Sequence, residues 1–406
     1  MPETSNIPQK PRTAQAKTAH VGALSVTPKG MRRVRNGHPW IFANDLVRGA
    51  QPATPGVVAV SDPGGMFVGQ ALFNPRSKIA LRLVTHTSAP VTADLFAERA
   101  RVAVRYRERV ASGFEAFRVV HSEADGLPGL TVDKYADILV VQQHAAALEP
   151  FMPAILDVLT RAYRPSGILA RNDHAVRALE GLPQTTEVLT GSVPDEVAFT
   201  EGEVTLFAAP YSGQKTGAFL DQRENHVYAG TLARGRALDV FSYHGGFALA
   251  LARHAESVVA LDSSAPALEH VAQAAAHNGL SNVTTLRGDA FEHLRAFNAA
   301  GETFDTIVLD PPAFAKGRGH LERALAGYKD INLQALKLLA PGGRLVTASC
   351  SYHLSDADFY AILQDAAGDA SRQVRVLARR TQAPCHPELL GLPETHYLKL
   401  AALEVV

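Results

Sequence analysis

From about residue 234 to its end, the chain alternates short apolar runs with longer segments of helical pattern. The apolar runs are ALDVF, SVVALD, VTTLRGD, FDTIVLD and GGRLVTASC, and two further strand-like runs close the chain. Alternation of strands and helices at this spacing is typical of a doubly wound, mainly parallel sheet. Ligands of such sheets bind at the carboxyl ends of the strands. We therefore expect an α/β domain over residues 201–406, with its ligand site at that edge.

The first of these strands leads into a pair of glycines. Asp239 ends the strand, and Gly245 and Gly246 open the next helix within the string FSYHGGF. Because glycine has no Cβ, a ligand can approach such a backbone closely. The string matches the dinucleotide pattern G-x-G-x-x-G poorly, so a cradle for a pyrophosphate is not evident. A nucleoside cofactor without phosphates would not need one.

Acidic residues end the next three strands as well. Asp262 lies 23 residues beyond Asp239, where a carboxylate can bind both ribose hydroxyls of NAD or of S-adenosylmethionine. Asp289 is placed to reach the exocyclic amine of adenine, and Asp310 follows in LDPPAF. A single Asp at such a place can equally be a helix N-cap. Four in succession favour a pocket for the methyl donor S-adenosylmethionine.

Two prolines follow the fourth strand directly. Pro311 and Pro312 fix a rigid extended turn after Asp310 and deny the strand a further ladder hydrogen bond. In nucleic-acid methyltransferases such a turn holds a base that has been extruded from its stack. Phe314 is available to stack on that base, or alternatively serves as a hydrophobic plug.

Cys350 ends the fifth strand, at the edge that carries Asp310. Addition of a thiolate to carbon 6 of a pyrimidine makes carbon 5 nucleophilic enough to accept a methyl group. A thiol with an ordinary pKa near 8.5 needs help to ionise, and His353 and Lys316 are candidate positive neighbours. The alternative for Cys350 is an inert buried cysteine. Cys385, in the string APCHP, lacks such a setting, and we interpret it as a structural or surface cysteine.

The charge of the chain is unevenly distributed. Residues 1–120 hold 17 Lys and Arg against 7 Asp and Glu, whereas residues 121–406 hold 23 against 33. A clustered basic face is typical of nucleic-acid binding, although a solvated basic tail and helix would give the same count. Residues 1–20 are polar and without periodicity, so we expect a disordered basic arm.

Short apolar runs separated by Pro and Gly predict a small β-barrel or sheet domain over residues 21–92. This segment contains Lys29, Arg32 and Arg33, which we expect to contact RNA phosphates. Trp40 follows in the string GHPWIF and could stack on a base, but core packing is the favoured interpretation.

Residues 93–112 place apolar residues among five arginines, which predicts a helix with a strongly basic exposed face. This helix opens a central α+β domain over residues 93–200, with strand-like runs and a second helix near 147–163. The segment shows no recognisable spacing of catalytic residues, so the sequence assigns it no function.

Composition excludes several classes of protein. No apolar run reaches the roughly 18 residues that a membrane span needs, and the N-terminus lacks a signal-peptide core. Two cysteines cannot form a disulfide framework, so we expect a soluble protein of the cytoplasm. The 16 histidines show no metal-ligand spacing, and no metal is expected.

Eight strings together carry a family resemblance. They are GHPWIF at 37–42, EADGLPGLTVDKY at 123–135, GQKTGAFLDQR at 213–223, FSYHGGF at 241–247, FDTIVLDPPAF at 304–314, GYKDINLQALKLL at 327–339, SCSYH at 349–353 and HPELLGLPETHYLK at 386–399. Over about residues 22–405 the chain resembles the ribosomal RNA large-subunit methyltransferase I family, whose members use S-adenosylmethionine to make 5-methylcytosine in 23S ribosomal RNA. The resemblance implies an N-terminal PUA domain that binds RNA, a central α+β domain and a C-terminal Rossmann-like methyltransferase domain, often in a homodimer.

The resemblance also implies roles for individual residues. The expected catalytic residues are Cys350 as nucleophile and Asp310 as a partner of the pyrimidine edge. The expected cofactor contacts are Lys215, Asp221, Gln222, Phe241, Ser242, Gly245, Gly246, Asp262, Asp289 and Asp310. The expected substrate contacts are Pro311, Pro312 and Phe314, joined by Lys29, Arg32 and Arg33 from the charge pattern. The chain departs from the family's pattern at His244, Tyr352 and Cys385.

The leading hypothesis is therefore a 23S ribosomal RNA cytosine carbon 5 methyltransferase. An RNA base N-methyltransferase on the same scaffold is the first alternative, because Asp-Pro-Pro-aromatic turns also serve that chemistry. A non-catalytic RNA-binding factor of ribosome assembly is a more distant one. An NAD-dependent dehydrogenase is disfavoured, because the phosphate-cradling pattern is absent.

Overall fold

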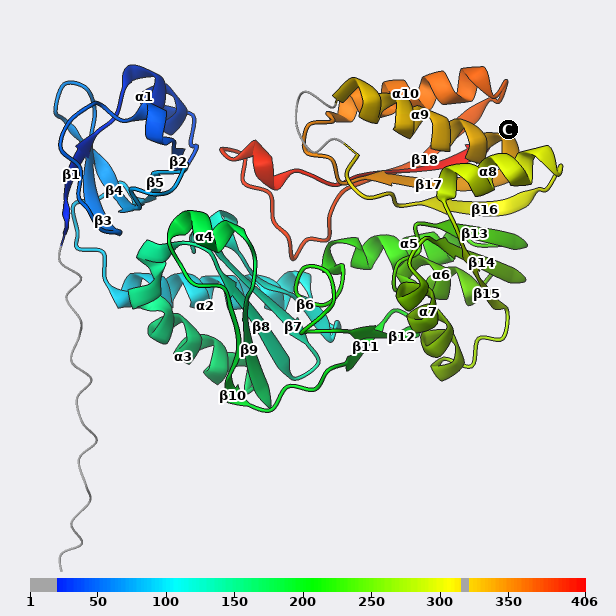
Figure 1. The fold of residues 1–406 in the computed structure, drawn as a ribbon, viewed down its shortest axis with the longest axis horizontal. Coiled ribbons are helices and arrows are strands. Elements are labelled where there is room, and N and C mark those ends of the chain that lie inside the picture. The colour runs from blue at the N-terminus through cyan, green and yellow to red at the C-terminus, as the bar shows by residue number, and fades with distance from the viewer. Residues whose placement is uncertain (1–19, 315–320) are drawn as a thin grey trace, which may run out of the picture.

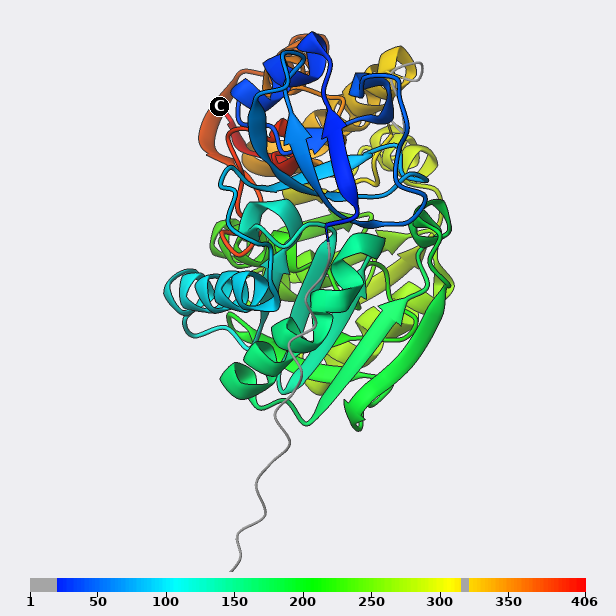
Figure 2. The ribbon, with the colours of Figure 1, turned by 90° about the vertical axis from the view of Figure 1, so that its left-hand side faces the viewer.

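The computed structural model describes residues 20–314 and 321–406. Three parts follow one another along the chain, each around its own sheet (Figures 1 and 2). Residues 1–19 of the predicted arm, and Lys316, lie outside the described residues. None of the helices in the described ranges is long and apolar enough to cross a membrane.

The N-terminal part is a five-stranded sheet in the order β1-β3-β4-β5-β2. Only the β1–β3 pair is parallel. Helix α1 lies between β1 and β2, capped by the Thr27 hydroxyl, and the predicted basic residues Lys29, Arg32 and Arg33 lie on it. The elements are β1 (Gly22–Ser25), α1 (Pro28–Arg35), β2 (Trp40–Ile41), η1 (Ala43–Asp45), β3 (Gly56–Ser61), β4 (Phe67–Phe73) and β5 (Leu81–Thr85). The prediction of a β-rich N-terminal domain is confirmed.

The central part is a second five-stranded sheet, in the order β10-β9-β8-β7-β6. Helix α3 connects the parallel pair β8–β9, and α2 packs beside α3 in the same hydrophobic core. The elements are α2 (Ala93–Val110), β6 (Ala116–His121), η2 (Ser122–Asp125), β7 (Leu130–Tyr135), β8 (Ile138–Gln143), η3 (Ala146–Phe151), α3 (Met152–Tyr163), β9 (Gly167–Asn172), α4 (Val176–Glu180) and β10 (Thr185–Gly191). An antiparallel hairpin, β11 (Val197–Glu201) with β12 (Val204–Ala208), leads to the last part.

The strongly basic exposed face predicted for α2 contains Arg101, Arg105 and Arg109, whereas the other two arginines of the helix point inward. Arg107 is 1% exposed, and its guanidinium lies 2.5 Å from the Asp125 carboxylate. Arg99 donates to two backbone carbonyl oxygens of neighbouring segments. Arg101 and Arg105 are exposed as predicted. Helical periodicity reports which face a residue occupies, but not that a buried carboxylate or carbonyl lies within reach of a long side chain.

The C-terminal part is a seven-stranded sheet in the order β15-β14-β13-β16-β17-β19-β18. The first five strands are parallel, and β19 is antiparallel to both of its neighbours. The elements are η4 (Leu220–Gln222), α5 (Arg223–Leu232), β13 (Arg236–Val240), α6 (Gly246–Ala252), β14 (Ser257–Asp262), α7 (Ala265–His277), β15 (Val283–Arg287), α8 (Ala290–Ala299), β16 (Phe304–Leu309), α9 (Leu321–Leu338), β17 (Leu339–Ser349), α10 (Asp356–Asp369), β18 (Val374–Arg380), η6 (Pro393–Thr395) and β19 (Lys399–Val405).

Two sets of helices cover this sheet. Figure 1 shows α8, α9 and α10 above the sheet and α5, α6 and α7 below it, and each set shares a core with the strands. The chain order reverses between β13 and β16, which makes this the topological switch point where such sheets bind ligands. The predicted doubly wound, mainly parallel sheet is confirmed.

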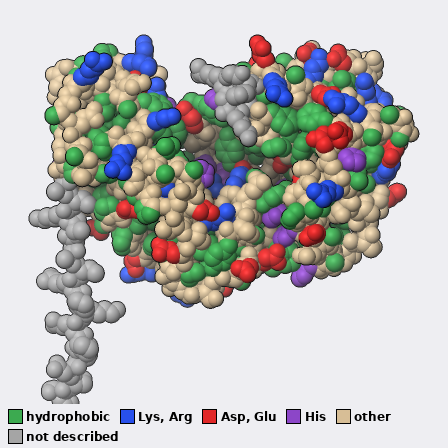
Figure 3. All heavy atoms as spheres, in the orientation of Figure 1, with side chains coloured by type: hydrophobic (Ala, Val, Ile, Leu, Met, Phe, Trp, Pro, Cys, Tyr) green, Lys and Arg blue, Asp and Glu red, His purple; other side chains and the backbone are tan. Residues whose placement is uncertain are grey.

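Side-chain contacts join the three parts. The indole Nε1 of Trp40 and the guanidinium of Arg82 both donate to one oxygen of Glu123, at 2.8 and 2.6 Å. Trp40 is thus held at the junction of the N-terminal and central parts. At the other end, His38 Nε2 lies 3.4 Å from the Glu394 carboxylate of η6, which reaches back from the C-terminal part. Figure 3 shows the molecule hollowed between its N-terminal part at the left and its C-terminal part at the right.

Candidate active site

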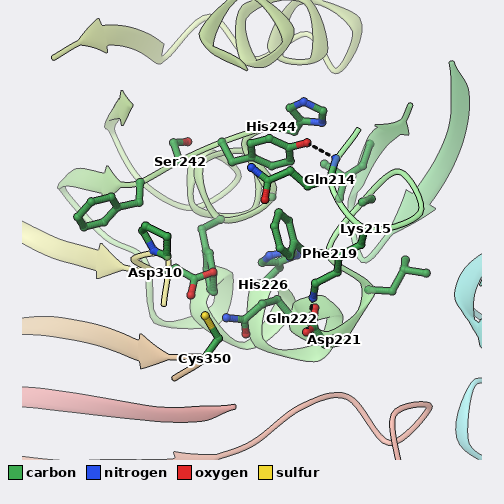
Figure 4. Close-up of a pocket in the computed structure, with 18 of the residues that line it drawn as sticks. Gln214, Lys215, Phe219, Asp221, Gln222, His226, Ser242, His244, Asp310 and Cys350 are labelled. Carbon is green, nitrogen blue, oxygen red and sulfur yellow. Dashed lines mark hydrogen bonds and ion pairs between the residues drawn. The ribbon is translucent and has the colours of Figure 1, made fainter. Parts of the chain in front are cut away.

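A cavity of about 630 Å³ lies at the carboxyl ends of the strands on both sides of the switch point. Asp262, the last residue of β14, lines this cavity, together with the residues that directly follow β13, β16 and β17, which are Phe241, Asp310 and Cys350. The segment 214–222 and the β11–β12 hairpin close the opposite side. Figure 4 shows Lys215, Gln222, Asp310 and Cys350 facing one another around this space. The strand-end rule thus brings residues at the ends of four separate strands onto one cavity wall.

The loop between β13 and α6 forms one side of the cavity. Phe241, Tyr243 and Gly245 have positive φ angles of 66°, 47° and 83°. Gly246 begins α6 and lines the cavity, and a Cβ there would lie 2.5 Å from the His226 ring. Glycine is therefore required at 246 by the packing of His226, whereas Gly245 shapes the turn from outside the lining.

A buried carboxyl supports this loop from behind. Asp239 accepts a hydrogen bond of 2.6 Å from the Ser242 hydroxyl, and Ser242 lines the cavity. Burial raises the pKa of Asp239 to about 7. Its second oxygen has no hydrogen-bond partner among the described residues.

The two acids predicted to hold the nucleoside lie in different surroundings. Asp262 lines the cavity and accepts hydrogen bonds from the backbone N–H groups of Tyr243 (2.9 Å) and Ser264 (2.8 Å). Asp289 is exposed, lies outside the cavity lining and caps α8 by accepting from the N–H of Glu292 at 3.1 Å. Asp289 therefore acts as a helix N-cap, as the alternative interpretation predicted, and only Asp262 of these two acids lies at the cavity.

An ion pair occupies the side of the cavity opposite the sheet. Lys215 Nζ lies 2.5 Å from Asp221 Oδ2, and the Tyr397 hydroxyl donates to the same oxygen at 2.7 Å. Burial alone would raise the pKa of Asp221, but Lys215 lowers it to about 2. Among the described residues, nothing hydrogen-bonds the other oxygen, Oδ1, which is buried.

The Asp-Pro-Pro turn forms the floor beside the sheet. Burial raises the pKa of Asp310 to about 6. The side chain of Gln222 opposes that rise. Pro311 and Pro312 line the cavity. Phe314 lies outside the lining, and its ring centroid is 4.7 Å from that of Tyr328. This contact fits the alternative interpretation of Phe314 as a hydrophobic plug.

Cys350 is partly buried, with its Sγ 3.9 Å from the carbonyl oxygen of Pro311. Burial, followed by the charge of Asp310, raises the pKa of the thiol to about 11, and Lys215 opposes that rise. His353, one of the predicted helpers, is not part of the lining. Lys399 Nζ instead donates to two carbonyl oxygens of residues 351 and 354, which fixes the segment after the thiol.

Cys385 lies away from the cavity and is buried. Its Sγ lies 3.3 Å from Nδ1 of the adjacent His386, and both side chains are enclosed. Burial raises the pKa of Cys385 and lowers that of His386. These contacts describe a structural residue. No cluster of His, Cys, Asp and Glu within the described ranges could hold a metal ion.

Sequence reasoning missed several cavity residues, among them His226 and Tyr397. His226 on α5 pairs with Glu201 of the hairpin at 2.6 Å, and this partner raises the pKa of His226 against the effect of burial. Tyr397 reaches the Asp221 carboxylate from the start of the last strand. The string HPELLGLPETHYLK was a signal for Tyr397, but nothing in its spacing pointed to residue 221.

The donor set fits S-adenosylmethionine. Asp262 can accept hydrogen bonds from ribose hydroxyls. The unpartnered oxygen of Asp221 can accept from an ammonium, and the Lys215 ammonium can pair with a carboxylate. An amino acid joined to a nucleoside carries these three groups.

The basic residues of α1 lie on the N-terminal part and outside this cavity. Lys29 and Arg33 lie 3.4 and 3.6 Å from the buried carboxylate of Asp45, while Arg32 is exposed. Part of this charge therefore serves the fold of its own domain. Arg32 is free to face a ligand.

Comparisons with known proteins agree with this architecture. Residues 24–86 match the family of PUA-like domains, and residues 170–392 match the S-adenosylmethionine-dependent methyltransferases. The chain is 37% identical to the ribosomal RNA large subunit methyltransferase I of Photobacterium profundum, over 91% of this chain and 95% of that protein. It is 40% identical to the protein of the same name from Aeromonas salmonicida, over 89% and 94%.

Two solved structures share the whole fold. A putative S-adenosylmethionine-dependent methyltransferase from Streptococcus mutans superposes with a TM-score of 0.79 at 18% identity, over 95% of this chain and all of that one. A putative methyltransferase complexed with SAH has a TM-score of 0.80 at 19% identity, with the same coverage.

Proposed function

Because the chain belongs to the ribosomal RNA large subunit methyltransferase I family, we propose that it methylates carbon 5 of a cytosine in 23S ribosomal RNA through a covalent adduct with Cys350. The chain is an S-adenosylmethionine-dependent methyltransferase. The observation that carries the finer proposal is the position of the Cys350 thiol beside Asp310 on the wall of the donor cavity (Figure 4).

A cysteine in this place answers a chemical need. Carbon 5 of cytosine is too weak a nucleophile to accept a methyl group unaided. Once the Cys350 thiol has lost its proton to a base, its sulfur forms a bond to carbon 6, and the electron pair displaced onto carbon 5 forms the new carbon–carbon bond while the methyl group leaves the donor sulfur. S-adenosylmethionine supplies the methyl group on a sulfonium centre. A base then removes the carbon 5 proton, and the carbon–sulfur bond breaks to release cysteine and restore the ring.

The pKa values of Cys350 and Asp310 in the free site show which protonation states must change when the substrate binds. Burial and Asp310 hold the pKa of Cys350 at about 11, so the thiol is protonated at neutral pH. Asp310, with a pKa of about 6, is mostly ionised there and can accept from the cytosine amino group. Protonation of Asp310 at the ring edge would stabilise charge on the ring during addition, and would remove a negative neighbour of the thiol.

The RNA substrate is proposed from the relatives' names and from the N-terminal part. PUA-like residues 24–86 carry exposed Arg32, and α2 adds exposed Arg101 and Arg105. Such side chains neutralise phosphates without reading sequence. A homodimer is an expectation from the family, which light scattering of the purified protein would test.

The deciding experiment is nucleoside analysis by mass spectrometry of 23S ribosomal RNA from a strain that lacks this protein. Complementation with the wild-type chain should restore one 5-methylcytidine, and Cys350→Ala should not. Cys385→Ala is the matched control, because that thiol lies outside the cavity. Restoration of 5-methylcytidine by Cys350→Ala would exclude the thiolate mechanism. Loss of a different methylated base in the strain would favour the N-methyltransferase instead.

A further inference from the structure

A line of side-chain hydrogen bonds runs from the last strands to the floor of the cavity. Arg380 Nε, at the end of β18, donates to Asn225 Oδ1 on α5 at 2.8 Å. Asn225 Nδ2 donates to Gln222 Oε1 on η4 at 2.7 Å. Gln222 lies beside Asp310 on the cavity wall, and its side chain lowers the pKa of that carboxyl. Figure 4 shows the Gln222 amide directed towards Asp310 and Cys350. Three segments that are far apart in the sequence, at residues 222–225, 310 and 380, thus lie in one series.

The series has a single consistent polarity. A guanidinium can only donate, so Arg380 sets the Asn225 amide with its oxygen towards β18. The same orientation is required by the Thr381 carbonyl oxygen, which can only accept and lies 3.1 Å from Asn225 Nδ2. Asn225 then presents a donor to Gln222, which leaves the NH₂ group of Gln222 for Asp310. If the Asn225 amide were reversed, its donors would face the Arg380 guanidinium and its oxygen would face two acceptors.

Burial makes this orientation costly to break. Asn225 is 1% exposed and Gln222 is 3% exposed, so neither amide can exchange its partner for bulk water. Arg380 is half-buried, packs over the Tyr228 ring at 4.7 Å and also donates to the Glu224 carbonyl oxygen at 3.4 Å. The series is therefore anchored at its outer end by a charged group with several contacts.

We propose that Arg380 and Asn225 are positioning residues, which hold the Gln222 amide with its NH₂ group towards Asp310 and so keep that carboxylate available as an acceptor for the substrate base. The proposal rests on the proposed function for the role of Asp310. Neither residue lines the cavity, so both act through Gln222.

The charged and titratable groups around Asp310 set the size of the effect. These groups are Lys215 before η4, Asp221 on η4, His226 on α5, Asp239 near the end of β13 and Cys350 after β17. His226 and Lys215 lower the pKa of Asp310, and Asp221 raises it. Because the Gln222 side chain also lowers this pKa, loss of that effect moves the pKa of Asp310 upward.

The test compares variants outside the cavity on the full-length protein. Methyl transfer to 23S RNA transcribed in vitro is measured against pH for Arg380→Met, Arg380→Lys and Asn225→Leu. Lysine can still donate to Asn225, and Asn225→Leu removes the amide while it leaves the charge of Arg380 in place. Arg379→Met is the matched control, because that neighbouring arginine stacks on Tyr360 at 4.1 Å and is exposed.

We expect Arg380→Met and Asn225→Leu to lower kcat and to move the acidic limb of the profile upward by about 0.5–1 pH unit. Arg380→Lys should restore most of the wild-type profile, and Arg379→Met should match it. Calorimetric affinity for S-adenosylhomocysteine should stay within about twofold in every variant that keeps its cooperative melting transition. Should Asn225→Leu fail to fold, Arg380→Met and Arg380→Lys decide the matter alone.

Coincident pH profiles for Arg380→Met and the wild type would overturn the proposal. That failure differs from a failure of the proposed function. If the wild-type protein methylates a position other than carbon 5 of cytosine, the proposed chemistry is wrong. The pH profile of the reaction that is then observed still tests whether Arg380 and Asn225 position Gln222.

Discussion

Lys215 and Asp221 form a 2.5 Å ion pair on the wall of the donor cavity, and only one of the two carboxylate oxygens takes part. Tyr397 donates to the oxygen that Lys215 already holds. The other oxygen is buried, and nothing within the described ranges hydrogen-bonds it. An unpaired buried carboxylate oxygen costs free energy unless a ligand supplies a donor. The pair therefore presents an acceptor and a cation side by side.

Lys215→Met should weaken the binding of S-adenosylhomocysteine by tenfold or more, or about 1.4 kcal/mol. The variant removes the cation that holds the pKa of Asp221 at about 2, so this pKa rises and the acceptor is partly lost. Isothermal titration calorimetry at pH 5 and pH 8 measures the effect. Lys134→Met, which removes a lysine outside the lining, serves as control. Equal affinities for Lys215→Met and wild type would exclude this pair from the cofactor site.

Asp310→Asn should abolish methyl transfer and yet stabilise the fold at neutral pH. Burial raises the pKa of Asp310 from 3.8 to about 6, so the free energy of unfolding falls as pH rises between these values. The amide avoids this loss, which amounts to about 1–3 kcal/mol above pH 6. Urea unfolding at pH 4 and pH 8 should show the gain at pH 8 alone. A gain of equal size at both pH values would contradict the assignment, and Asp137→Asn at an exposed site is the control.

Local pattern explains why much of the architecture could be predicted. Strand–helix alternation indicated the parallel sheet, and the strand-end rule indicated that Asp262, Asp310 and Cys350 share one edge. The structure places all three on the cavity wall. The same rule did not separate Asp289 from them, because β15 is an edge strand whose terminal acid caps the next helix instead.

Contacts across the chain could not be predicted from spacing. The Tyr397–Asp221 and Arg380–Asn225 hydrogen bonds join residues 176 and 155 positions apart. Helix α1 was also missed, because its eight residues include four basic ones and only two large apolar ones, which is too few for a clear period. The burial of Arg107 depends on a carboxylate and two carbonyl oxygens from other segments.

Exposed arginines of the N-terminal half should make RNA binding salt-dependent. Arg101→Gln with Arg105→Gln is expected to reduce the slope of log K against log salt by about 1 for each phosphate that the variant no longer neutralises. Filter binding of 23S RNA fragments between about 50 and 200 mM salt measures that slope. Arg99→Gln, at the inward-facing position of the same helix, should leave the slope unchanged. An unaltered slope in the double variant would show that this face of α2 does not bind RNA.

Arg107→Met should destabilise the protein by about 3–5 kcal/mol, because it leaves the Asp125 carboxylate without its cation in a buried place. The guanidinium also donates to the Cys385 carbonyl oxygen at 2.8 Å, so the change loosens the C-terminal segment from the central part. Arg109→Met, on the exposed side of the same helix, should stay within about 0.5 kcal/mol of wild type. Denaturant unfolding of both variants measures the difference. Equal midpoints for the two would contradict this account, because the Asp125 carboxylate would then not be left as an uncompensated buried charge.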